Sequence, residues 1–484
     1  MYYKSILFFF GSLLLFACSK ENSSNPISYE EPTKESSIST RINLDLLPFD
    51  IYDTTIKGNT YYVAVDGNDS NEGSMEQPWK SWGKAFKTAK AGDLVYFREG
   101  VYYSETDLGG ERDFNKGTPD SIIRFFNYPG EKPILDCSRR PITDNSFNGG
   151  ITMLRAEYIH MKGLEVRNVF QGMDSNAEGI GMTLSGNIVM ENMVVHHVGG
   201  EAFVTADYHG IIHFINSDAY EVCDSNRTAV YPTPGSPGQN GAGFHFKNYS
   251  ETPNASESKL YYTGCRAWDF SDNGFAGTSI GYVEWNQCWA FNGGMFSGDG
   301  CGFKYASTYR ENNTLPLART LKYCISAMNG AYGFSPNNNG DTPMVVQLFN
   351  NSAYHNGYKE NIGNGPAYGW FILKTNTNDT IQGELYANNL AYDNEKAEAF
   401  VSREQTWVHQ YNSFDIDGFS LNNQNFLSLD WTEMKRSRKS DGSLPDIQFL
   451  KPAIHSPVID VGMDVGLYYN GEAPDLGAFE YNSF

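Results

Sequence analysis

Helical periodicity is confined to one segment of this chain. Residues 79–90, WKSWGKAFKTAK, carry Trp79, Trp82, Phe86 and Ala89 at steps of three and four residues, the spacing of a buried helix face. Elsewhere short apolar runs are broken by Asn and Gly, which favour tight turns. The pattern predicts one short helix among many short strands.

One phrase recurs along the chain: Asn or Cys, a variable residue, a small or aliphatic residue, often an aromatic, then Asn or Gly. Its copies are NMVVHHVGG at 192, NSDAYEVCDSN at 216, CRAWDFSDNGF at 265, CWAFNGG at 288, CISAMNGAYGF at 324, NSAYHNGY at 351 and NLAYDNEK at 389. The gaps from 192 to 216 and from 265 to 288 are 24 and 23 residues, the length of one coil of a right-handed parallel β-helix. We therefore predict an all-β solenoid with inserted loops, capped at its open end by the helix at 79–90.

The first residues have the layout of an export signal. Residues 1–18 place Lys4 before an apolar run too short to span a bilayer as a mature helix. Leu15 to Cys18, LFAC, resembles the lipobox of bacterial lipoproteins, which implies a mature protein anchored by lipid on Cys18 in the outer membrane or at the cell surface. The alternative is an ordinary cleaved signal peptide.

Composition divides the rest of the chain into a tether and one domain. Residues 19–57 are rich in Ser, Glu, Asn and Pro, which predicts a disordered tether. Residues 58–484 contain no second such stretch and are expected to form a single β-helix domain, most simply a monomer.

Charge and cysteine usage narrow the possible partners. The 57 acidic and 36 basic residues give a net charge of −21, which repels nucleic acid. An anionic substrate would need clustered basic side chains or a bound cation.

Cys265, Cys288 and Cys324 share one register of the repeat and are expected to be buried free thiols.

Several segments resemble the family 9 polysaccharide lyases, which are secreted parallel β-helix enzymes. The segments are YYVAVDGNDSNEGSMEQPWKSWGKAFKTAKAGDLVYFREGVY at 61–102, then GFHFK, GCRAWDFSDNGF and GDGCGFKYA in the family's order, and KSDGSLPDIQFLKPAIHSPVIDVGMDVGLYYNGEAPDLGAFEY at 439–481. The resemblance covers nearly all of the predicted mature chain. It implies a right-handed β-helix that acts on pectin, rhamnogalacturonan or another acidic polysaccharide.

The resemblance also implies positions for a calcium site, and most of them have changed. The family's four acidic ligands fall on Ala242, Asp272, Asn273 and Ala276, so Asp272 is the one matching carboxylate. Calcium prefers six to eight oxygen ligands. We therefore expect weak or absent calcium binding by Asp272 and Asn273. The alternative is a site rebuilt from shifted acids, for which the candidates are Asp218, Asp224, Asp269 and Asp299.

The family's catalytic lysine is retained as Lys304 in GDGCGFKYA. In β-elimination a base removes the proton at C5 of a uronate and the C4 glycosidic oxygen leaves. A lysine acts as that base once desolvation or a nearby cation lowers its pKa. The candidates for neutralising the substrate carboxylate are Lys247, His245, Arg266 and Arg310, and the candidates for sugar contacts are Tyr231 and Tyr309.

Three functions remain open from the sequence. Lys304 favours a polysaccharide lyase with weak or no dependence on calcium. The loss of the acids beside Asp272 favours a glycan-binding protein that has kept the scaffold without the chemistry, in which the Lys304 stem only covers a coil edge. Hydrolysis by paired carboxylates is disfavoured because no acid pair stands out from the turn residues.

Overall fold

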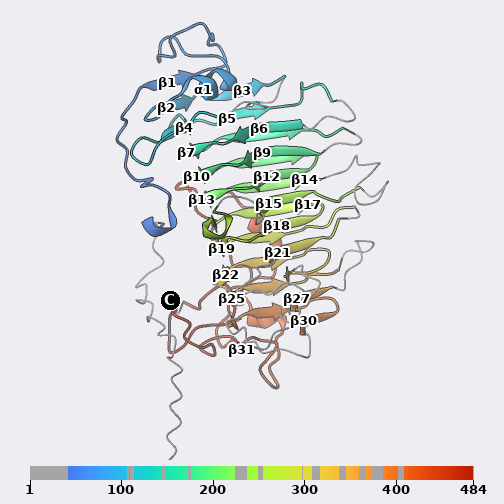
Figure 1. Ribbon diagram of the computed structural model, residues 1–484. Helices are drawn as coiled ribbons and strands as arrows, with labels where there is room; N and C mark the ends of the chain where they lie inside the picture. Colours follow the sequence, from blue (N-terminus) through green and yellow to red (C-terminus); the bar gives the residue numbers. More distant parts are fainter. Residues whose placement is uncertain are drawn as a thin grey trace, which may run out of the picture.

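The computed structural model is an elongated stack of coils whose strands form three parallel sheets (Figure 1). It describes residues 42–482 except for 106–107, 109–113, 143–147, 173–175, 224–236, 249–253, 297, 308–316, 337–344, 359–366, 373–384 and 402–407. In this part of the chain no helix is both long enough and apolar enough to cross a membrane.

In each sheet the strands follow chain order, and each pairs in parallel with the next. Sheet A contains β1 (Thr60–Val63), β2 (Leu94–Phe97), β4 (Ile123–Asn127), β7 (Glu157–Lys162), β10 (Gly186–Glu191), β13 (His209–Ile215), β16 (Lys259–Thr263), β19 (Tyr282–Asn286), β22 (Leu317–Lys322), β25 (Val345–Phe349), β28 (Leu385–Ala387) and β31 (Val408–Gln410). Sheet B contains β3 (Gly100–Tyr103), β5 (Pro133–Asp136), β8 (Glu165–Val169), β11 (Val194–Val198), β14 (Asp218–Val222), β17 (Arg266–Phe270), β20 (Trp289–Phe291), β23 (Ile325–Ala327), β26 (Ser352–Tyr354) and β29 (Leu390–Tyr392). Sheet C contains β6 (Asn148–Leu154), β9 (Ala177–Thr183), β12 (Glu201–Ala206), β15 (Ala242–Asn248), β18 (Asn273–Ser279), β21 (Cys301–Ser307), β24 (Phe334–Ser335), β27 (Tyr368–Ile372) and β30 (Ala397–Val401). The predicted parallel β-helix is confirmed.

The repeated phrase of the sequence marks sheet B. Its seven copies supply β11, β14, β17, β20, β23, β26 and β29, one strand in each successive coil. Asn side chains at the ends of these strands form ladders along the stack, in which Asn351 Nδ2 donates to Asn389 Oδ1 at 3.0 Å and Asn389 Nδ2 donates to Asn412 Oδ1 at 2.8 Å. The ladders satisfy buried backbone groups at the turns, which explains why the phrase recurs.

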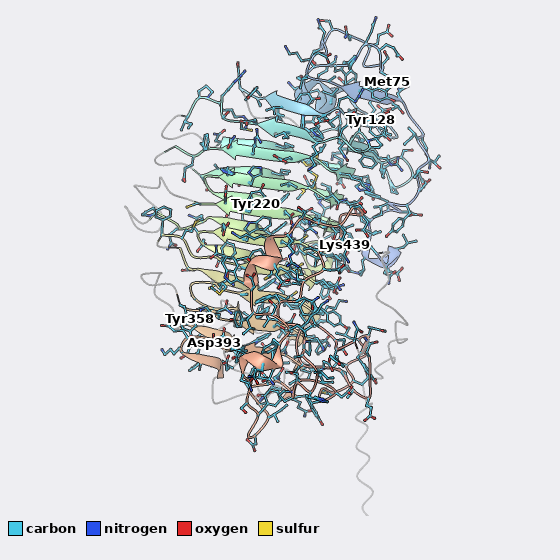
Figure 2. All side chains as sticks on the ribbon, turned by 180° about the vertical axis from the view of Figure 1, so that it is seen from behind. Met75, Tyr128, Tyr220, Tyr358, Asp393 and Lys439 are labelled. Carbon is cyan, nitrogen blue, oxygen red and sulfur yellow. The ribbon has the colours of Figure 1, made fainter. Side chains whose placement is uncertain are left out.

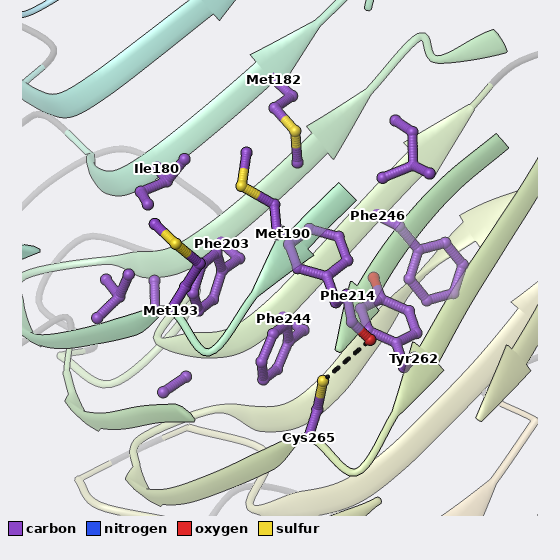
Figure 3. Close-up of a cluster of buried hydrophobic side chains, with 14 of the residues drawn as sticks. Ile180, Met182, Met190, Met193, Phe203, Phe214, Phe244, Phe246, Tyr262 and Cys265 are labelled. Atoms are coloured by element: carbon purple, nitrogen blue, oxygen red, sulfur yellow. Dashed lines mark hydrogen bonds between the residues drawn. The ribbon is translucent and has the colours of Figure 1, made fainter. Parts of the chain in front are cut away.

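Stacked aromatic rings fill the interior behind sheet C. Phe203, Phe244, Phe275 and Phe303 lie ring on ring, with centroids 4.8, 4.8 and 4.9 Å apart, close to the spacing of adjacent strands. Figure 3 shows part of this core, with Phe203 and Phe244 beside methionines and Cys265. Because each coil contributes one ring to the row, the register of sheet C is fixed from inside the stack.

The predicted core cysteines occupy a second interior row. Cys265, Cys288 and Cys324 are free and fully buried, and each thiol lies against backbone carbonyls, as Cys265 does against Phe214 (Figure 3). Burial raises the pKa of the Cys265 and Cys288 thiols well above their usual value. They are therefore unreactive packing residues.

The helix α1 closes the N-terminal end of the stack, as predicted, but it is shorter than the periodic segment. It runs from Trp82 to Thr88 because Ser81 is its N-cap, accepting from the Lys84 amide at 3.1 Å, and Ala89 is already outside the helical region. Trp82 and Phe86 pack on Phe97 from the first coils. Within the described residues the other helical turns are the 3₁₀ helices η1 (Leu44–Leu46), η2 (Ala255–Glu257), η3 (Asn423–Asn425) and η4 (Trp431–Lys435).

The predicted tether is wrong at its C-terminal end. Residues 42–57 run along the outside of sheet A, and Leu47 packs with Val189 and Ile215 in a small apolar cluster (Figure 1). The His213 ring lies 3.1 Å from the Leu46 carbonyl oxygen. Leu47, with Ile42, Phe49 and Ile51 packed beside it, supplies the apolar surface that binds the sheet, and the average composition of residues 19–57 does not reveal this.

The C-terminal segment covers the outside of sheet B. From about residue 412 it turns back along the stack, and its apolar residues, including Met434 and Phe449, pack on Trp268, Phe291 and others of that sheet (Figure 2). Two outer faces of the three-sided solenoid are thus covered by the chain's own ends.

Candidate functional site

The outer face of sheet C is the face on which neither terminal segment lies in the described part of the chain. Phe244, Phe275 and Phe303 point into the core from β15, β18 and β21. Because side chains alternate along a strand, the residue after each Phe points outward. These residues are His245, Ala276 and Lys304.

Strand register places the predicted site residues in two adjacent rows. His245 pairs with Ala276, and Ala276 pairs with Lys304. In the second row Ala242 pairs with Asn273, and Asn273 pairs with Cys301. With strands about 4.8 Å apart, each row spans only about 10 Å. The positions that the family resemblance assigned to metal ligands and base therefore lie in or next to three neighbouring strands of sheet C, β15, β18 and β21.

Lys304 is held by acidic neighbours. Its ammonium forms an ion pair with Asp299, and the Asp299 amide donates to Asp272 Oδ1 at 2.8 Å. Only 9% of the Lys304 side chain is exposed, against 45% for Asp299. Asp299 can therefore move into solvent more easily than Lys304.

The pKa of Lys304 lies above its usual value. Burial by itself lowers this pKa, but the anionic surroundings outweigh burial. The contributing groups are Cys301, Asp272 and Asp299. Burial raises the pKa of the Cys301 thiol to about 12, so Cys301 is neutral at pH 7 and the carboxylates are responsible. The amine is therefore protonated in the resting protein, contrary to the lowered pKa that a base requires.

A second ion pair lies two coils away in the same row. His245 Nδ1 contacts a Glu201 carboxylate oxygen, and Glu201 is almost fully buried at the start of β12. Burial by itself lowers the pKa of His245, but the Glu201 charge outweighs burial and raises it. Burial by itself raises the pKa of Glu201, which His245 and then Lys247 bring below its usual value. Both shifts favour an imidazolium paired with a carboxylate.

The residues at the family's metal positions do not make a calcium site of that type. Ala242 and Ala276 offer no side-chain oxygen, and Asp272 already accepts the Asp299 amide. Asn273 Oδ1 is buried without a hydrogen-bond partner, so one amide oxygen is available. One carboxylate in family position and one amide oxygen fall well short of the ligands that calcium prefers.

Of the acids considered as shifted ligands that lie among the described residues, only Asp299 lies near Lys304. Asp218 is buried between Arg266 and Arg438. Asp269 is paired with Lys435 and hydrogen-bonded to Asn292. Asp224 lies outside the described residues.

The remaining predicted substrate contacts divide into three groups. Lys247 lies on the outward side of β15, two residues beyond His245, and is partly exposed. Arg266 lies on a different sheet from His245 and Lys247, and its predicted substrate contact is wrong. It is buried on sheet B, where its guanidinium binds Asp218 and the Met434 carbonyl under the C-terminal segment. Arg310, Tyr231 and Tyr309 lie outside the described residues.

Sequence reasoning missed Glu201. It stands two residues before Phe203, as Ala242 stands two residues before Phe244, and these two Phe residues pair in the ladder. Glu201 therefore occupies, one coil earlier, the place of the first family acid. Alignment of successive coils on the Phe row would have found it.

Comparisons with known proteins agree with this geometry. Residues 61–412 match the family model described as Pel9A-like, right handed beta helix region, so the predicted handedness and the family resemblance are confirmed. Pectate lyase L of Dickeya dadantii (strain 3937) is 28% identical over 445 residues, covering 87% of this chain and 90% of the relative. Pectate lyase PEL9 of Emericella nidulans is 24% identical over 430 residues, covering 81% and 92%.

Two solved structures share the fold. The crystal structure of pectate lyase Pel9A superposes with a TM-score of 0.65 at 25% identity, covering 88% of this chain and 97% of the other. A rhamnogalacturonan lyase superposes with a TM-score of 0.61 at 22% identity, covering 82% and 97%. The parallel β-helix architecture is thus shared with these two solved structures.

Proposed function

Because the chain belongs to the Pel9A-like right-handed β-helix family, we propose that it is a polysaccharide lyase that cleaves a uronate-containing polysaccharide by β-elimination. The observation that carries the proposal is the position of Lys304 on the outer face of sheet C, in one row with His245 and Ala276. The relatives' names, which include pectate lyase and rhamnogalacturonan lyase, support a pectic substrate.

Lys304 is proposed as the base. The neutral amine takes the C5 proton, the C5–H electron pair forms the C4–C5 double bond, and the C4–O bond breaks with its electrons on the glycosidic oxygen. That oxygen takes a proton as the leaving chain departs. Since the resting amine is protonated beside Asp299, catalysis first requires its proton to be lost.

His245 and Lys247 are proposed to bind the substrate carboxylate. Both lie outward on β15, and the methyl side chain of Ala276 leaves room between His245 and Lys304. A carboxylate placed over Ala276 would contact the imidazolium on one side and present its neighbouring C–H bond to the amine on the other. Positive charge fixed there stabilises the enolate-like transition state.

Calcium is not required in this proposal, since Ala242 and Ala276 remove two ligands and His245 supplies a positive charge nearby. Export, lipid attachment at Cys18 and a monomeric state complete the proposal, and they rest on the signal layout and the solenoid architecture.

A glycan-binding protein is the second candidate, and one observation favours it. The carboxylates beside Lys304 raise its pKa, as they would in a site that no longer removes protons. The distinguishing experiment incubates the protein with polygalacturonate, rhamnogalacturonan and alginate and follows the ultraviolet absorbance of the unsaturated product. Binding without any unsaturated product would favour the second candidate.

A further inference from the structure

Two adjacent histidines on sheet B face each other. His196 and His197 are consecutive in β11, and in a regular strand they would point to opposite sides. His197 instead has φ of 53°, in the left-handed region. This turn brings the two rings to the same side, with the Nδ1 atoms 2.5 Å apart.

A carboxylate from the next coil completes the group. Glu221 in β14 stands opposite His197, because the flanking pairs are His196 with Tyr220 and Val198 with Val222. Glu221 is also left-handed, with φ of 50°, and its carboxylate lies 2.5 Å from His197 Nε2. Ligand atoms of His196, His197 and Glu221 all lie within 4.8 Å of one another.

The orientation of His196 is fixed from two sides. Its Nε2 lies 3.1 Å from Glu165 on the preceding coil, and Glu165 is itself near Arg167. Tyr220 stacks on the other side, with ring centroids 4.5 Å apart and an interplanar angle of 5°. A carboxylate behind one ring nitrogen is the usual support for a metal-binding histidine, since it leaves the other nitrogen's lone pair free.

The contacts of the two rings leave their Nδ1 atoms facing each other. Because each Nε2 faces a carboxylate, each is best protonated and donating, His196 to Glu165 and His197 to Glu221. The two Nδ1 atoms then face each other across 2.5 Å, where a proton or a metal ion can lie between them.

We propose that His196, His197 and Glu221 form a binding site for one divalent transition-metal ion of the zinc class. Two imidazole nitrogens and one carboxylate oxygen are a common three-ligand set for zinc, with water at the fourth position. Calcium is disfavoured because it selects oxygen ligands.

The surroundings permit an ion to enter. His196 is nearly buried, but the His197 and Glu221 side chains are 48% and 47% exposed, so Glu221 can give up its contact with His197 Nε2 and turn to an ion at the Nδ1 atoms. With zinc–nitrogen bonds of about 2.0–2.1 Å in tetrahedral geometry, the two Nδ1 atoms need to part by less than about 1 Å. The site shares no residue with the row of His245, Ala276 and Lys304, so it does not depend on the proposed lyase activity.

Isothermal titration of the mature protein without a polyhistidine tag, using zinc chloride, tests the proposal. One zinc per chain should bind, and cobalt in its place should give the visible absorption of a tetrahedral site. His197→Ala should abolish this binding, and Glu165→Gln should weaken it about 10–100-fold. Glu221→Gln should weaken it as well and is the variant to use if His197→Ala fails to fold.

The chain offers a matched control in His355. It occupies the same left-handed position in a later coil and pairs with one carboxylate, Asp393, at 2.8 Å, but Tyr354 replaces the first histidine. His355→Ala should leave zinc binding unchanged. Absence of saturable zinc binding, or binding that persists in both His197→Ala and Glu221→Gln, would overturn the proposal and leave His196 and His197 as a proton-sharing pair.

Discussion

Lys304 forms an ion pair with Asp299, which lies five residues earlier in the chain and at the surface of the same face. The Asp299 backbone in turn donates to Asp272, the one acid retained from the family's metal positions. The carboxylates of Asp272 and Asp299 thus stabilise the charged form of the amine.

Replacing Lys304 with Ala should abolish turnover while preserving polysaccharide binding. Removal of a general base typically lowers the rate by ~10²–10⁴. Initial rates of unsaturated-product formation, together with a binding isotherm, measure the two effects separately. Lys259→Ala is the control, because this exposed lysine lies on sheet A. Unchanged turnover in Lys304→Ala would show that another group is the base.

Replacing Asp299 with Asn should move the rising limb of the pH–rate profile, which reports deprotonation of Lys304, to lower pH. The Asp299 carboxylate is among the groups that raise the pKa of Lys304, so its removal should lower that pKa and increase the neutral amine at a given pH. The measurement is kcat/KM against pH for wild type and variant. Asp446→Asn, at an exposed pair with Lys439, should leave the profile unchanged. A shift to higher pH would contradict this account of the Lys304 environment.

The fold could be predicted from the sequence because each coil repeats the same residue types at the same positions. Asn at the turns and Phe in the core recur at the same register, so the position of one coil predicts the next. The same regularity predicts that Lys304 lies beside Ala276, and no contact between distant segments has to be known for this prediction. Local repetition was therefore enough for the sheet that carries the proposed site.

Contacts between distant segments could not be predicted in this way. Arg266 is buried by residues that follow it by 168 and 170 positions, and no residue near Arg266 in the sequence indicates that they will cover it. His245 and Glu201 are 44 residues apart, with the stretch 224–236 between them, so counting along the chain does not align them. The pairing depends on register, which only the stacked coils define.

Replacing Glu201 with Gln should destabilise the protein and remove part of the pH dependence of its stability. Removing one partner of a buried ion pair typically costs about 3–5 kcal/mol, and the lower end is expected because a quarter of the His245 side chain is exposed. The raised His245 pKa gives stability that is complete below its unfolded pKa and is lost as pH rises through the folded value. The lowered Glu201 pKa gives stability that is present above its unfolded value and is lost as pH falls through the folded one.

Urea unfolding at several pH values measures this difference. The free energy of unfolding of wild type should exceed that of Glu201→Gln most between these two limits, in mildly acidic solution. The difference should become smaller at lower and at higher pH. Glu257→Gln is the control, since this exposed acid lies in η2 away from His245. A gap that is constant with pH would mean that the pair is not ionised.

Cys18 should be the lipid-modified first residue of the mature protein. The expectation rests on LFAC at residues 15–18 and the polar stretch that follows. Mass spectrometry of the N-terminal peptide from native membranes should find acyl chains on Cys18, and Cys18→Ser should release the protein from the membrane. An N-terminus beyond Cys18 would contradict this expectation.

Calcium should bind weakly to the wild-type protein and more tightly once the missing carboxylates are restored. Ala242 and Ala276 lie near Asn273 and Asp272 at positions where the family resemblance implies acids. Ala242→Asp together with Ala276→Asp would raise the number of carboxylates at these positions from one to three, nearer to what calcium prefers. Calorimetric titration should therefore detect stronger binding, and melting temperature should rise with calcium in the double variant only.

The matched control for the calcium experiment changes charge without completing the site. Thr278→Asp, together with Thr183→Asp, adds two carboxylates to outward positions of sheet C beyond the two rows. If nonspecific negative charge were sufficient, this variant would bind calcium as well as the first one does. Tight calcium binding by the wild-type protein would instead show that Asp272, Asn273 and Asp299 form a working site despite the two alanines, and calcium would then have to be included in the proposed mechanism.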